Sequence, residues 1–163
     1  MNQYELLHGL VLVKLVNNSK GKRTLRLIET SPDTAYGEYI INDTINLFAK
    51  YCTVPRGKKA KTWHFTFTEK DIKQIEARGS RAYVVLICGQ EQFDSTRTEL
   101  CLLKPDDLFK LLDIVDLRPQ GVSVKGLFGK QLRVSNSNLK ANFGKQEILV
   151  PQNALETWII PGS

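Results

Sequence analysis

The stretch Asn46–Asp71, NLFAKYCTVPRGKKAKTWHFTFTEKD, contains the sharpest changes of residue pattern in this chain. Its first part, Asn46–Cys52, predicts a β-strand, because Leu47, Ala49 and Tyr51 fall on one face and the intervening residues on the other. A turn, Val54–Thr62, follows and contains proline and glycine. The cations of this turn are Arg56, Lys58, Lys59 and Lys61. A lysine on a strand beside a basic turn points to a site for nucleic-acid phosphates.

The second part of the stretch predicts another strand and the start of a helix. Trp63, Phe65 and Phe67 alternate with polar residues, a pattern typical of a half-buried strand. Thr68 and Asp71 have the spacing of a capping box, with aspartate in place of the usual glutamate. We therefore expect a helix to begin directly after this strand.

The rest of the chain predicts further strands and helices around this centre. Gln3–Val16 is interpreted as a mostly buried helix, with a strand as the alternative because its second half is rich in valine. Ala82–Cys88, AYVVLIC, has no polar alternation, which predicts a central strand buried on both faces. Further strands are predicted at Thr24–Glu29, Tyr36–Asn42, Glu99–Leu103 and Ile148–Val150, and a hairpin at Val122–Val134 with Gly126 and Gly129 in its turn.

Two predictions concern packing towards the C-terminus. A helix is expected to begin at Pro105, because proline suits the first helical position and acidic residues follow it. Its inner face is predicted to carry Leu108, Leu111, Leu112 and Val115, and the tail is predicted to pack through Trp158, Ile159 and Ile160.

Composition restricts the class of protein. With 163 residues the chain fits a single domain, and 42% hydrophobic with 25% charged residues is ordinary for a globular protein. A formal net charge of +6 favours an anionic partner. No stretch resembles a membrane span or a secretion signal, so we expect a cytoplasmic protein that does not bind membranes. Cys52, Cys88 and Cys101 lack CxxC spacing and are expected to be buried thiols.

The order of helix, strands, lysine-bearing strand, helix and buried strand resembles the restriction-endonuclease-like, or PD-(D/E)xK, nucleases over Tyr4–Gly89. The resemblance implies an α/β fold, with α+β left open, in which helices flank a mixed β-sheet. Residues 1–103 would then form a nuclease-like core, and residues 104–163 an extension made of a helix and a β-hairpin.

The same resemblance implies catalytic residues. Glu5 takes the position of the family's helical glutamate, Pro32-Asp33 that of its PD element with Glu38 as an alternative acid, and Lys50 that of its lysine. Asp33 and Glu38 would hold Mg²⁺, which polarises the scissile phosphate. The residue two positions before Lys50 is Phe48, where the family has an acid, so a non-catalytic relative is the competing interpretation.

Each of these residues also has a structural interpretation. Glu5 can stabilise a helix N-terminus, Pro32-Asp33 can be an ordinary turn, and Lys50 can pair with Glu38. The aromatic residues of the second strand are expected in the core, and His64 between them on the exposed face.

Two functions stay open. The first is nucleic-acid binding, DNA rather than RNA, with Mg²⁺-dependent cleavage of restriction or homing type if the acids converge. The second is a non-catalytic interaction or DNA-binding subunit of a defence or mobile-element system, and either is compatible with a homo-oligomer. Besides the four cations of the turn, the predicted nucleic-acid contacts are Lys125, Lys130 and Arg133 of the C-terminal hairpin.

Overall fold

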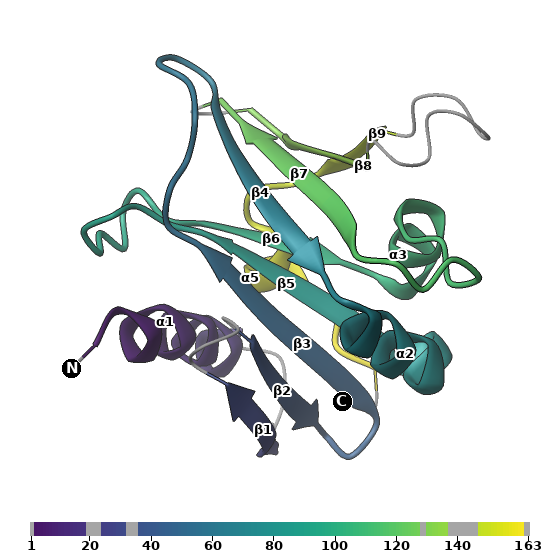
Figure 1. Ribbon diagram of the computed structural model, residues 1–163. Helices are drawn as coiled ribbons and strands as arrows, with labels where there is room; N and C mark the ends of the chain where they lie inside the picture. The colour runs from purple at the N-terminus through teal and green to yellow at the C-terminus, as the bar shows by residue number, and fades with distance from the viewer. Residues whose placement is uncertain (1, 19–23, 32–35, 128–129, 137–146, 162–163) are drawn as a thin grey trace.

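Two β-sheets dominate the computed structural model (Figure 1), which describes residues 2–18, 24–31, 36–127, 130–136 and 147–161. Sheet A has five strands in the order β1-β2-β3-β5-β6, and sheet B has four in the order β4-β7-β8-β9. The strands are β1 (Leu25–Ser31), β2 (Tyr36–Ile41), β3 (Ile45–Cys52), β4 (Lys61–Phe67), β5 (Ala82–Cys88), β6 (Glu99–Leu103), β7 (Gln120–Gly126), β8 (Leu132–Asn136) and β9 (Glu147–Val150). The helices are α1 (Gln3–Asn17), α2 (Glu69–Arg78), the 3₁₀ turn η2 (Gly79–Arg81), α3 (Pro105–Leu111) and α5 (Ala154–Thr157).

Sheet A is mixed, as the sequence predicts. Strands β1, β2 and β3 form an antiparallel meander, β3 and β5 are parallel, and β6 is antiparallel to β5. The parallel pair needs a long connection, which β4 and α2 supply. The prediction that Ala82–Cys88 is buried on both faces is confirmed, since Val84, Val85 and Leu86 are inaccessible. The middle of the sheet, however, is occupied by β3, and β5 lies between β3 and β6.

Helix α1 covers one face of sheet A. It begins with a capping box in which the Asn2 side chain and Glu5 exchange hydrogen bonds. Leu7, Val11 and Leu15 recur every four residues and form one buried stripe. The stripe packs on the face of β3 that carries Leu47 and Ala49, together with the C-terminal Trp158 and Ile160. The predicted helix is therefore confirmed, and its strand alternative is wrong.

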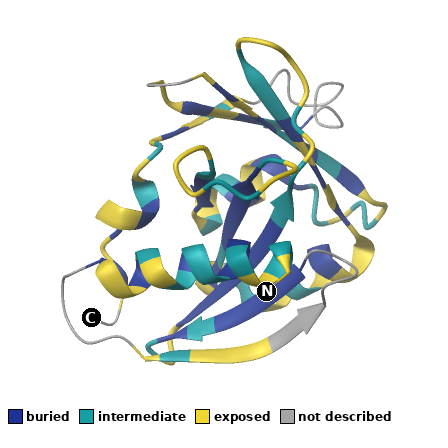
Figure 2. Ribbon diagram, turned by 90° about the vertical axis from the view of Figure 1, so that its left-hand side faces the viewer, coloured by how far each residue is buried: buried dark blue, intermediate teal, exposed yellow. Residues whose placement is uncertain are grey.

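The opposite face of sheet A packs against α2 and the inner face of sheet B. Trp63, Phe65 and Phe67 of β4 are buried there, as predicted, against Phe48 and Leu86 of sheet A. The larger core cluster thus lies between the two sheets, and Figure 2 shows the buried positions concentrated on these strands.

Helix α2 begins at the predicted capping box, in which Thr68 and Asp71 exchange hydrogen bonds. It ends at Gly79, whose φ of +56° favours glycine. Among the helices that the structure describes, none is long and apolar enough to cross a bilayer.

Three details differ from the predictions. Strand β4 does not join the sheet of β3 but pairs antiparallel with β7, so a strand from residues 1–103 and the C-terminal hairpin share sheet B. Val115 is 89% exposed, because α3 ends at Leu111 before that position can turn inward. Ile159 is 81% exposed, because the extended tail buries its neighbours Trp158 and Ile160 and directs alternate residues outward.

Candidate nucleic-acid interface and the predicted catalytic residues

Lys50 is a buried cation on the face of β3 that packs against α2. Its residue is 7% exposed, and its Nζ donates a hydrogen bond of 2.8 Å to Asp71 Oδ2. The same Nζ lies 5.9 Å from the centroid of the Tyr36 ring and 5.4 Å from that of Phe67, within the range of cation–π attraction. Because Asp71 also accepts the backbone N–H of Thr68, one carboxylate caps α2 and neutralises Lys50.

Glu38 is the carboxylate of a second buried ion pair. It is 1% exposed, and its Oε1 accepts hydrogen bonds from Asn46 Nδ2 at 2.9 Å and from Arg78 Nε at 3.2 Å. Its Oε2 lies 3.5 Å from the hydroxyl of Tyr36. Arg78 is in the last turn of α2, and Asp71 is in its first turn. The two ion pairs therefore attach both ends of α2 to sheet A.

The structure brings together only part of the predicted catalytic set. Glu38 and Lys50 lie on the α2 side of sheet A. Glu5 belongs to α1, which covers the other side, and its carboxylate accepts the backbone N–H of Asn2 at 3.0 Å in the capping box. Asp33 lies outside the described residues. Lys50 pairs with Asp71 and not with Glu38, the partner considered from the sequence.

The described donor set does not fit Mg²⁺. Magnesium needs open carboxylate oxygens and space for several waters. Glu38 is almost fully buried, and its carboxylate is occupied by Asn46, Arg78 and Tyr36. Within the part of the chain that the structure describes, no three His, Cys, Asp or Glu side chains form a group that could hold a metal. The geometry therefore gives no basis for a cleavage step through these residues.

The two basic segments predicted from the sequence lie at the same end of sheet B. Lys61 of β4 pairs with Gly126 of β7 in the last rung between these strands, so the β3–β4 turn and the β7–β8 turn are adjacent. Five cations at this end are exposed and, among the described residues, none of them forms an ion pair. We call them the cationic end: Arg56, Lys58, Lys59, Lys125 and Lys130.

The β3–β4 turn has a closed conformation. Arg56 and Thr62 exchange two backbone hydrogen bonds of 2.9 and 2.8 Å, which close a hairpin tip around residues 57–61. Gly57 has a φ of +101°, and a Cβ there would lie 2.2 Å from the carbonyl oxygen of Ala60. Lys61 Nζ donates to the Gly57 carbonyl at 2.9 Å. Glycine and Lys61 therefore maintain a tight turn that leaves Lys58 and Lys59 exposed at its apex.

Of the seven residues predicted to contact nucleic acid, Lys61 and Arg133 have structural roles in sheet B and its turn. Lys61 is half-buried and holds the tip, as described above. Arg133, opposite Lys125 on the neighbouring strand, forms an ion pair of 3.1 Å with Glu147. Its charge is therefore partly neutralised.

The outer face of sheet B is polar along β4 and β7, and Leu149 of β9 is exposed on it. His64 is exposed, as predicted, and its Nδ1 lies 3.1 Å from Ser123 Oγ on β7. The imidazole lies over Gly121, where a Cβ would approach its Cε1 to 2.7 Å. No phenylalanine, tyrosine or tryptophan of the described sheet B strands points outward, because Trp63, Phe65 and Phe67 are all buried.

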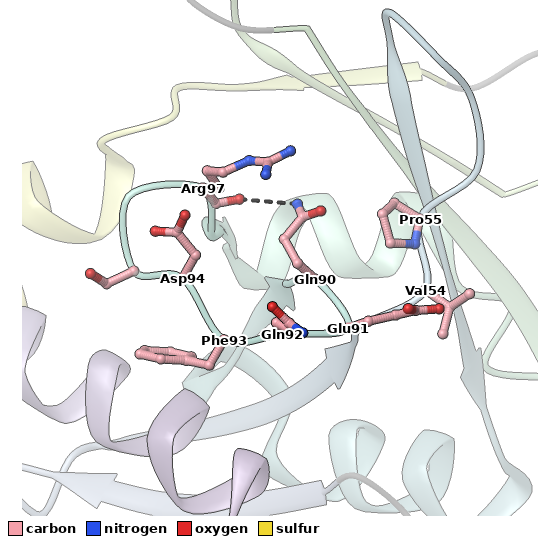
Figure 3. Close-up of a pocket in the computed structure, with 9 residues that line it drawn as sticks. Val54, Pro55, Gln90, Glu91, Gln92, Phe93, Asp94 and Arg97 are labelled. Atoms are coloured by element: carbon pink, nitrogen blue, oxygen red, sulfur yellow. Dashed lines mark hydrogen bonds between the residues drawn. The ribbon is translucent and has the colours of Figure 1, made fainter.

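A cavity of about 670 Å³ lies beside the base of the hairpin tip, between the segment after β3 and the loop after β5 (Figure 3). Val54 and Pro55 form one wall, and the loop forms the rest. Two of its carboxylates, Glu91 and Asp94, face this region. Hydrogen bonds from the Thr96 hydroxyl and backbone lower the pKa of Asp94, which keeps that carboxyl ionised. The cavity also contains Arg97, so two carboxylates and one guanidinium line it, and its charge favours phosphate less than that of the cationic tip.

Sequence reasoning missed a buried hydrogen bond between His8 of α1 and Tyr39 of β2. His8 is 4% exposed, and its Nδ1 lies 2.7 Å from the hydroxyl of Tyr39. Burial lowers the pKa of His8 to about 4, and burial followed by the nearby Tyr4 raises the pKa of Tyr39 to about 12. His8 Nε2 is buried with no hydrogen-bond partner. The sequence does contain a signal for the burial of His8, because His8 directly follows Leu7 and lies three residues before Val11, beside the apolar stripe of the helix.

The partners of Lys50 and Glu38 were also missed. The sequence predicts Asp71 as a helix cap, and no pattern in it points to Arg78 as a partner of Glu38. Their pairing needs residues distant in sequence to meet across the sheet–helix interface, for which the sequence has no local signal.

The three thiols are free, as expected. Cys88 and Cys101 are buried and Cys52 is half-buried. Burial raises the pKa of both thiols, reinforced by Cys101 and Cys52 at Cys88 and by Asp107 at Cys101, so neither is a reactive thiolate.

Comparison of this chain with protein families, curated proteins and solved structures found no match in any of the three.

Proposed function

We propose that this protein binds nucleic acid through the cationic end of sheet B and that it does so without cleaving it. The observation that carries the proposal is the convergence of two basic turns, distant in sequence, at one end of the sheet. Neutralising several phosphates together releases condensed counterions, which drives nucleic-acid binding. Five exposed cations without ion pairs among the described residues are available for such contacts.

The order of elements in sheet A supports the resemblance to a restriction-endonuclease-like scaffold. A helix, three antiparallel strands, the sheet B strand β4, a second helix and a strand parallel to the third follow one another in the chain. On this scaffold the lysine-bearing strand β3 continues directly into the basic hairpin tip. DNA is accordingly the proposed partner.

Binding is favoured over cleavage because the candidate catalytic groups have structural partners. Lys50 is paired with Asp71, and Glu38 with Arg78, both inside the interface of α2 with sheet A. A lysine that orients a water for attack would have to leave a buried carboxylate without its counter-charge.

Fluorescence anisotropy with labelled DNA tests the binding proposal. Replacing Lys58, Lys59, Lys125 and Lys130 by alanine should weaken binding by at least about 100-fold at low salt, because each lost phosphate contact lowers the affinity. The melting temperature should change little, since all four side chains are exposed. Unchanged affinity in the folded variant would contradict the proposal.

Incubation with plasmid and single-stranded DNA, with and without Mg²⁺ or Mn²⁺, tests the cleavage function. The proposal expects binding with no metal-dependent product. Cleavage that is lost in Glu38→Gln would instead support the Mg²⁺-dependent nuclease implied by the resemblance.

A further inference from the structure

The hairpin tip is a narrow, two-stranded projection. The bridge between Arg56 and Thr62 holds its two segments side by side, and the last rung of sheet B lies at Lys61 and Gly126. In Figure 1 the tip extends beyond the ends of β7 and β8. Lys58 and Lys59 are exposed at its apex, where the chain reverses. The tip therefore presents two cations on a ribbon and not on a flat surface.

The dimensions of nucleic acids determine which form can accept such a ribbon. The major groove of B-form DNA is about 12 Å wide and admits a two-stranded β-ribbon. The major groove of A-form RNA is deep and too narrow for side chains to read. Lysine ammonium groups that enter the DNA groove meet the O6 and N7 acceptors of guanine.

The surroundings of the tip favour a duplex over a single strand. Proteins that bind single strands stack the bases on aromatic side chains. The described residues of the tip contain no aromatic side chain, and Trp63, Phe65 and Phe67 of β4 are buried in the core. Lys125 lies one rung from the tip, opposite Thr62, and is exposed on sheet B. It is positioned to contact the phosphates that border a groove.

We propose that the hairpin tip enters the major groove of B-form DNA, with Lys58 and Lys59 at the base edges and Lys125 at the bordering phosphates. This inference rests on the proposed function and adds the form of the partner and the mode of contact. Tight closure of the tip by Gly57 and Lys61 supports it, because a rigid turn loses less conformational entropy on insertion.

Four probes of about two helical turns test the inference by fluorescence anisotropy at one ionic strength. They are a DNA duplex, an RNA duplex of the same sequence, its single DNA strand, and a DNA duplex with bulky groups at C5 of its pyrimidines. These groups fill the major groove without changing the phosphates. We expect the plain DNA duplex to bind roughly tenfold more tightly than each of the other three.

The double variant Lys58→Ala/Lys59→Ala should remove this preference. Its control is Lys104→Ala/Lys110→Ala, which removes the same charge from exposed positions at α3, beside the opposite end of sheet B. The control should keep the preference for the plain duplex.

The outcomes separate the two proposals. Equal binding of the plain and the C5-substituted duplex, or of DNA and RNA duplexes, would overturn groove entry and leave backbone binding intact. Absence of binding to every probe would overturn both groove entry and the proposed function.

Discussion

Lys50 shows how a single residue can fit a functional motif and still serve the fold. Its position on a strand before a basic turn suggests phosphate chemistry. In the folded chain it is enclosed by Asp71 and two aromatic rings. A buried cation in such a place is tolerated only because its counter-ion is fixed by a second role, the cap of α2.

Replacing Lys50 by alanine should therefore destabilise the protein by about 3–5 kcal/mol, because Asp71 would be left as a buried, unpaired charge. Urea denaturation measures this free energy of unfolding. The double variant Lys50→Met/Asp71→Asn should recover most of the loss, since no charge remains and the asparagine oxygen can still cap the helix. A loss below about 1 kcal/mol in the single variant would show that the pair is largely solvated.

His8 should make stability depend on pH. Its pKa in the folded chain, about 4, lies below the ordinary value of 6.5, so the unfolded chain binds the proton first as the pH falls. The free energy of unfolding is therefore highest, as far as His8 is concerned, above pH 6.5. It decreases towards pH 4 by up to about 3 kcal/mol. Urea denaturation at several pH values should show this loss.

The variant His8→Gln isolates the contribution of the histidine, because glutamine can still bond to the Tyr39 hydroxyl and does not titrate. Its free energy of unfolding should fall less than that of the wild type between pH 6.5 and 4. Parallel curves for the two proteins would mean that His8 does not cause the dependence.

At the scale of elements, the β3–β4 hairpin depends on one glycine. Gly57→Ala should distort the tip and destabilise it by about 1–3 kcal/mol, because φ is positive and the Cβ would meet the Ala60 carbonyl. DNA affinity, measured by anisotropy, should fall although every cation remains.

Gly79→Ala is the matched control. This glycine also has a positive φ, but a Cβ there meets no atom within 4 Å and the site is remote from the tip. We expect a loss of stability with unchanged DNA affinity. Equal effects of the two variants on affinity would show that the conformation of the tip is not important for binding.

At the scale of the whole molecule, charge is distributed by the packing of the two sheets. The net charge of +6 is modest, yet sheet B gathers five cations that lack ion pairs among the described residues. Three other cations are neutralised by ion pairs with nearby carboxylates: Lys50 with Asp71, Arg78 with Glu38 and Arg133 with Glu147. A mildly basic chain thus acquires one strongly basic end.

The salt dependence of binding should report this arrangement. If Arg56, Lys125 and Lys130 contact phosphates while Lys58 and Lys59 face base edges, log Kobs against log salt should have a slope near −2.7 for duplex DNA, about −0.9 per phosphate contact. Lys125→Ala/Lys130→Ala should make the slope shallower by nearly 2, because two phosphate contacts are lost. A slope close to zero in the wild type would mean that binding does not run through the cationic end.

Much of the local structure could be predicted from the sequence, because its causes are local. Alternation of Trp63, Phe65 and Phe67 places them on one strand face, and the Thr68–Asp71 spacing satisfies the first backbone N–H groups of α2. The unbroken apolar run of β5 allows no exposed face. These features depend on neighbours within a few residues, so the sequence by itself determined them.

Only the tertiary structure decided which elements share a sheet and which charges meet. Strand β4 could pair with β3 by local criteria, but its aromatic face is buried when it pairs with β7 across the core. That choice brings the turn after β3 beside the turn after β7. The packing of α2 on sheet A likewise brings Asp71 to Lys50, 21 residues earlier in the chain, on the side of the sheet opposite α1 and Glu5. Such pairings depend on how the sheets and helices bury their apolar faces against one another. No short segment of the sequence contains that information.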